Sequence, residues 1–227
     1  MKSILIFAVV LMFTPLVQAM NMSSISNSCH CFKDRDLDPK RKFATDSYLL
    51  TTSFNSFIAA NFHISKSQIV MMKMKGGVDP DDLLIALFVS RAGGIELKTL
   101  FSVVENGGSW EDIFASKSLQ VSDADLQTFT DLGAVVEDKE KAGELVTDSL
   151  LKDFFSIGEQ DISSLRREGA TGREITLVYL LEKYGKRDAA ATEIYAMYGK
   201  DKMSWGEIAA FFGLTPNATG KLLLNDG

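Results

Sequence analysis

Three adjacent residues, Cys29, His30 and Cys31, carry the side chains in this sequence that are best suited to binding a metal or to redox chemistry. The chain has no further cysteine, and its other histidine is His63. Thiolate and imidazole ligands suit a tetrahedral zinc or Cu(I) site. Structural zinc sites, however, usually separate paired cysteines by more than one residue, so coordination by all three adjacent side chains is difficult.

Oxidation of the two thiols is the alternative, and the sequence favours it over a Cu or Zn site. A disulfide between Cys29 and Cys31 would close a tight ring, which should be strained and easily reduced. Exported thiols seldom stay free, so we expect an oxidised pair and no cofactor. A redox-catalytic role is disfavoured because the C-x-x-C spacing and a βαβ context are both missing.

A group of methionines offers further sulfur atoms. Met71 and Met74 lie three residues apart, which places them on one face of a predicted helix. Thioethers favour Cu(I), but methionine is mainly an adaptable apolar side chain. We therefore expect these two residues to contact a partner helix or the N-terminal segment. The candidate metal ligands are Cys29, His30, Cys31, His63, Met71 and Met74.

An internal repeat predicts the elements that would position these side chains. The two tryptophans stand in matching stretches, Ser109-Trp110-Glu111-Asp112-Ile113 and Ser204-Trp205-Gly206-Glu207-Ile208. Aligned on these stretches, residues 62–116 and 155–213 match as two copies of one unit. A helix expected before each copy extends the match to 46–116 and 144–213.

The apolar positions of the two copies correspond, with two exceptions. Ile69 and Met72 match Ile162 and Leu165, whereas Met71 and Met74 align with Ser164 and Arg167. Each copy predicts four helices, and no stretch shows the alternation typical of a strand. Helix starts are indicated by Asp79-Pro80 and by capping boxes at Ser65, Thr171 and Ser204. The predicted class is all-α, with two internally repeated small helical-bundle units preceded by an extended leader.

The N-terminus predicts export. Lys2 precedes an apolar run from Ile4 to Val17, which is typical of a signal peptide and short for a membrane-spanning helix. We expect cleavage after Ala19, with a retained anchor as the alternative. The expected divisions are a signal peptide (1–19), an extended leader (20–44), helical unit 1 (45–121), a connecting helix and linker (122–143), and helical unit 2 (144–227).

Two expectations within these divisions bear on packing. A helix from about Asp46 to Asn61 should pack on the first copy, and the charge run 137–141 should be the linker. The 24 basic and 30 acidic residues give a net charge of −6. This balance disfavours electrostatic capture of nucleic acid or anionic lipid. We expect a periplasmic or secreted protein that meets the membrane only through an uncleaved signal segment.

Two stretches resemble known proteins. The pattern C-H-C-F-x-x-R-x-x-D-P, from Cys29 to Pro39, resembles the N-terminal segment of some uncharacterised exported bacterial proteins, and that resemblance implies no activity. Residues 204–219 resemble the helix-turn-helix of bacterial transcriptional regulators. Phosphate contact there requires lysine or arginine, and Thr215 to Gly227 contains only Lys221. We therefore expect this stretch to serve in packing and not to bind DNA.

Sequence motifs of catalysis do not appear: there is no G-x-S-x-G, H-E-x-x-H, phosphate loop or dinucleotide fingerprint. The leading hypothesis is an exported, non-enzymatic helical-repeat protein that binds another protein or associates with itself. The alternative is a copper- or zinc-handling or redox protein that uses the Cys-His-Cys segment. An enzyme with dispersed carboxylates ranks below both.

Overall fold

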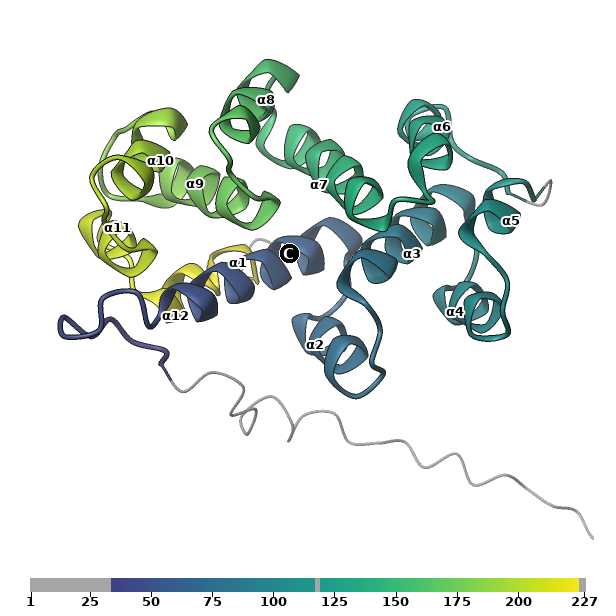
Figure 1. Ribbon diagram of the computed structural model, residues 1–227, viewed down its shortest axis with the longest axis horizontal. Helices are drawn as coiled ribbons and strands as arrows, with labels where there is room; N and C mark the ends of the chain where they lie inside the picture. Colours follow the sequence, from purple (N-terminus) through teal and green to yellow (C-terminus); the bar gives the residue numbers. More distant parts are fainter. Residues whose placement is uncertain (1–33, 117–118, 225–227) are drawn as a thin grey trace, which may run out of the picture. The chain divides into compact units, whose positions relative to one another are not determined.

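The computed structural model describes residues 34–116 and 119–224, and within them it contains twelve α-helices, one short 3₁₀ helix and no strand (Figure 1). The predicted all-α class is confirmed. The helices are α1 (Asp46–Phe62), α2 (Lys66–Met74), α3 (Pro80–Gly93), α4 (Leu97–Glu105), α5 (Trp110–Phe114), α6 (Leu126–Val135), α7 (Lys139–Phe155), α8 (Glu159–Arg167), α9 (Gly172–Tyr184), α10 (Ala191–Gly199), α11 (Trp205–Phe211), α12 (Pro216–Thr219) and the 3₁₀ helix η2 (Leu222–Leu224).

Each of the two predicted copies holds four helices, α2 to α5 in the first and α8 to α11 in the second. A 17-residue helix precedes each group, α1 in one half and α7 in the other. The following helices have 9, 14, 9 and 5 residues in the first half and 9, 13, 9 and 7 in the second. The order and the lengths thus agree, while a common origin of the halves stays a prediction.

Local capping explains where these helices start. The capping boxes at Ser65, Thr171 and Ser204 are present as predicted, and the Asp79 carboxylate accepts hydrogen bonds from two backbone N–H groups before α3. The two long helices also end alike. Each is followed by a non-glycine residue in the left-handed region, His63 (φ 51°) after α1 and Ser156 (φ 56°) after α7.

The long helices are exchanged between the halves. α1 packs most extensively on α9, and α7 packs most extensively on α3 (Figure 1). The expected helix at 46–61 is present and packs on α2 and α3 of the first copy, as expected, but its most extensive packing is on α9 of the second copy. α1 has three fully buried apolar side chains, Leu49, Phe57 and Ile58, and α9, α12 and η2 contact the helix in addition to α2.

The charge run expected as a linker lies largely within a helix. α7 begins at Lys139, because the Asp138 carboxylate caps it by accepting a hydrogen bond from the Lys141 N–H. Only Glu137 and Asp138 of that run remain outside the helix. The resemblance to a helix-turn-helix also ends early, because α12 has four residues and is too short to serve as a recognition helix.

Both tryptophans are buried, with exposed fractions of 4% for Trp110 and 0% for Trp205. The Trp110 indole donates a hydrogen bond to the Asp82 carboxylate at 2.8 Å. Trp205 instead stacks on Tyr198, with ring centroids 4.6 Å apart, and its indole N–H has no partner among the residues described. Within the part of the chain that the structure covers, no helix combines the length and apolarity needed to cross a bilayer.

Candidate functional site

The predicted metal ligands fall in different places. Cys29, His30 and Cys31 lie outside the described residues, so neither the disulfide nor the metal site is tested. His63 is exposed at the end of α1. On α2, Met71 is half-buried and Met74 is 55% exposed. No three of the described histidine, aspartate and glutamate side chains are grouped so that they could hold a metal ion.

A groove of about 530 Å³ opens between α8, α9 and the start of α10. The residues of α8 that line it recur every three or four positions and therefore share one helical face. α9 contributes two residues that are three apart. The polar lining residues of these two helices are Gln160, Asp161, Ser164, Arg167, Tyr179 and Glu182. A neighbouring hollow of about 540 Å³ is lined only by residues 158–161 and 163, so no second element closes it.

Tyr179 forms the floor of the groove. Its side chain is only 5% exposed, and its ring stacks on Phe155 with centroids 5.6 Å apart. The hydroxyl has no hydrogen-bond partner among the described residues and is not sealed in the core, so it opens into the groove. Burial, and then the charges of Asp161 and Glu182, raise the pKa of Tyr179 to about 12. The hydroxyl is therefore neutral at physiological pH and close to two carboxylates.

The charged lining residues are only partly satisfied by the fold. One oxygen of Asp161 accepts a hydrogen bond from the Gly158 N–H at 3.1 Å, and one oxygen of Glu182 accepts from the Ala191 N–H at 3.1 Å. Arg167 donates from Nε to a carbonyl of its own helix at 3.3 Å. Each carboxylate thus keeps an oxygen, and the guanidinium keeps its terminal nitrogens, for a molecule in the groove.

The polarity of this groove is particular to the second half of the chain. Ser164 and Arg167 align with Met71 and Met74, and Tyr179 aligns with Leu87. The sequence distinguishes the two methionines because their counterparts are polar, whereas the match of Tyr179 with the apolar Leu87 predicts a core position. That interpretation missed the groove, because burial of the ring and exposure of the hydroxyl are set by the neighbouring helices α8 and α10.

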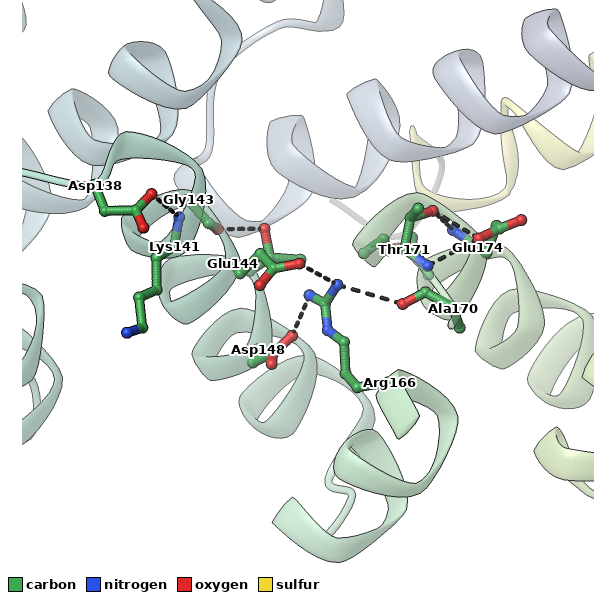
Figure 2. A network of polar contacts seen from close by, with 12 residues as sticks. Asp138, Lys141, Gly143, Glu144, Asp148, Arg166, Ala170, Thr171 and Glu174 are labelled. Atoms are coloured by element: carbon green, nitrogen blue, oxygen red, sulfur yellow. Dashed lines mark hydrogen bonds and ion pairs between the residues drawn. The ribbon is translucent and has the colours of Figure 1, made fainter. Parts of the chain in front are cut away.

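A second polar group ties α8 to α7, as Figure 2 shows. Arg166 donates from Nη2 to Asp148 at 2.7 Å and from Nη1 to Glu144 at 3.0 Å, and its side chain is 17% exposed. Nη1 also lies 3.4 Å from the carbonyl oxygen of Ala170, which precedes the Thr171–Glu174 capping box at the start of α9. This arrangement is an interhelical clamp, because both terminal nitrogens of Arg166 bind carboxylates of α7, while the buried Nε has no partner among the described residues.

The first half has a counterpart without carboxylates. Lys73 of α2 donates to the side-chain oxygen of Asn55 in α1 at 2.9 Å, and a separation of 93 residues relates this pair to Arg166 and Asp148. Burial first, and then the charge of Arg173, lower the pKa of Lys73 to about 8. Lys66, at the start of α2, donates to the Gly220 carbonyl at 2.9 Å, and burial likewise lowers its pKa to about 8.

Comparison of the whole chain with protein-family models, with curated proteins and with solved structures found no match.

Proposed function

We propose that this chain is an exported, non-enzymatic helical-repeat protein that binds another protein or a second copy of itself. The observation that supports protein binding is the surface of α4, which presents more apolar side chains than its neighbours cover. A helix with an apolar face normally buries that face against a partner.

Apolar residues make up five of the nine positions of α4: Leu100 is buried, Leu97, Phe101 and Val104 are half-buried against the core, and Val103 is exposed. Val103 is 38% exposed, and α3 is the main contact of the helix. The helix in the same place in the second half, α10, buries Ala191, Ile194 and Tyr195 against α9 and α11. An apolar helix left partly open to water is typical of an interaction surface.

Two other exposed apolar side chains lie on helices that precede α7. Met74 of α2 is 55% exposed and Leu126 of α6 is 50% exposed. By contrast, Phe211 of the second half is covered on one side by the Arg187 guanidinium, which lies 4.1 Å from its ring centroid. The distribution supports the first half as the binding half.

The proposal also holds that the chain is internally duplicated and that it is exported. The matched helix order supports the duplication, as does the recurrence of one interhelical hydrogen bond at Lys73–Asn55 and Arg166–Asp148. The signal-like N-terminus supports export, and mass spectrometry of the protein from the periplasm or medium would test it by locating the mature start at Met20.

A photo-crosslinking residue at position 103 tests the binding proposal. In the full-length chain in its host cells, and in the purified mature chain, we expect an adduct of defined mass on illumination. The control places the same residue at the exposed Lys200 that follows α10. Crosslinking at 103 that does not exceed crosslinking at 200 in both settings would contradict the proposal, and turnover in a broad hydrolase screen would contradict its non-enzymatic part.

A further inference from the structure

The groove between α8, α9 and α10 holds polar groups that the fold itself leaves without partners. The Tyr179 hydroxyl belongs to a side chain that is 95% buried, and it has no hydrogen-bond partner among the described residues. A buried polar side chain that opens into a groove of this size is expected to have its hydrogen bond completed by water or by a ligand.

The negative and positive side chains that α8 contributes to the groove lie near opposite ends of the helix. Asp161 lies in the first turn of the helix and Arg167 is its last residue, so the helix rise places them about 9 Å apart. Tyr179 and Glu182 belong to the acidic end, since the carboxylates of Asp161 and Glu182 both act on the Tyr179 hydroxyl. One end of the groove therefore attracts a cation, and the other attracts an anion.

We propose that this groove binds a small zwitterion that carries a primary ammonium group and a carboxylate. An ammonium has three N–H donors and no acceptor. The acidic end offers three acceptors, which are the second oxygen of Asp161, the second oxygen of Glu182 and the oxygen of the Tyr179 hydroxyl. The ligand carboxylate pairs with the terminal nitrogens of Arg167, whose planar fork matches a carboxylate.

The composition of the lining supports this class over an apolar ligand or an isolated ion. Gln160, Ser164 and Thr192 line the groove, and no described residue bonds to their side chains. Arg167 disfavours a metal cation, and the two carboxylates disfavour a simple anion. The first half carries Met71, Met74 and Leu87 at the aligned positions, so the repeated architecture does not require polar residues there.

The test uses unbranched zwitterions as molecular rulers on the full mature chain. Backbone amide NMR shifts would be followed during titration with glycine, 4-aminobutanoate and 6-aminohexanoate, and with n-butylamine and butanoate as single-charge controls. We expect saturable shifts confined to residues 157–168 and 179–192. The best of the three zwitterions should bind about tenfold or more tightly than either control, because both ends of the groove are then engaged.

Variants separate the two ends. Arg167→Met places the aligned residue of the first half in the groove, and it should weaken zwitterion binding about tenfold while leaving butylamine binding unchanged. Glu182→Gln keeps an acceptor for the Ala191 N–H and should weaken binding of both. Lys200→Met makes the change that matches Arg167→Met outside the groove and should leave every affinity unchanged.

Three results would overturn the inference: no saturable shift in the groove, a zwitterion that binds no better than butylamine, or wild-type affinity in Arg167→Met. None of these results bears on crosslinking at position 103, so the proposed protein-binding role stands or fails separately.

Discussion

At the scale of single residues, the two halves differ in the hydrogen-bond partners of a basic side chain, which is Lys73 of α2 in the first half and Arg166 of α8 in the second. Arg166 meets two carboxylates, whereas Lys73 meets the neutral side chain of Asn55. Arg166→Met should lower the free energy of unfolding by about 2 kcal/mol, because two charge-assisted hydrogen bonds are lost. Urea denaturation measures this loss. Lys141→Met changes an exposed residue of α7, and its free energy of unfolding should stay within about 0.5 kcal/mol of wild type. A loss as large as that of Arg166→Met would contradict a stabilising role for the Arg166 clamp.

The lysines predict a pH dependence of stability with a definite sign. The pKa values of Lys66 and Lys73 are about 8 in the folded chain, against 10.5 for an ordinary lysine. Between pH 8 and pH 9.5 the unfolded state therefore binds more protons, and the free energy of unfolding should rise with pH. Urea midpoints at these pH values measure the effect, and Lys73→Met should reduce the slope. Asn55→Asp should raise the pKa of Lys73, and a flat or falling wild-type profile would contradict this account.

The Cys-His-Cys segment predicts the oxidation state of its two thiols. The mature chain, purified without reductant, should have a mass lower by two hydrogens than the reduced chain, because exported thiols oxidise. Native mass spectrometry after reduction and addition of Cu(I) or Zn(II) distinguishes the alternative. A stoichiometric metal adduct that Cys29→Ser abolishes would favour the metal-handling hypothesis over the disulfide.

At the scale of elements, the sequence predicted which segments form helices, but it did not predict which helices pack against each other. The caps at Ser65, Thr171 and Ser204 lie within four residues of the groups that they satisfy, so the sequence predicts them directly. The partner of α1 depends on which of several similar apolar faces is nearest after folding, and no local pattern encodes it. For the same reason the groove beside Tyr179 was missed, although Ser164 and Arg167 were already exceptional positions.

Close approach of α7 to α3 gives an element-scale prediction. A Cβ on Gly143 of α7 would lie 2.6 Å from the Asp81 carboxylate of α3. Gly143→Leu should therefore lower the free energy of unfolding by about 2 kcal/mol, because the Asp81 side chain must be displaced and the larger side chain must still fit between the two helices. Thermal unfolding measures this change. Gly199→Ala, at the end of α10 with nothing within 4 Å, should be neutral or slightly stabilising, and equal losses at both sites would refute the close contact.

At the scale of the whole molecule, the exchange of α1 and α7 predicts that neither half folds alone. A fragment ending at Asp138 keeps α1 without α9, and the fragment from Lys139 keeps α7 without α3. Separately, each should show little helical circular dichroism and no cooperative melting, whereas mixing should restore both. A cooperative transition in either isolated fragment would show that the exchanged contacts are dispensable.

The exchange also sets the order in which the chain can become stable. Synthesis completes α1 at Phe62, but α9, on which α1 packs most extensively, begins only at Gly172, so α1 cannot complete its packing until most of the polypeptide has left the ribosome. Long sequence separation between contacting residues slows folding. A nascent chain that remains unfolded for this interval stays narrow enough to thread through a translocation channel. If the chain is exported as we propose, the exchanged packing of the two long helices would delay folding until translocation is under way.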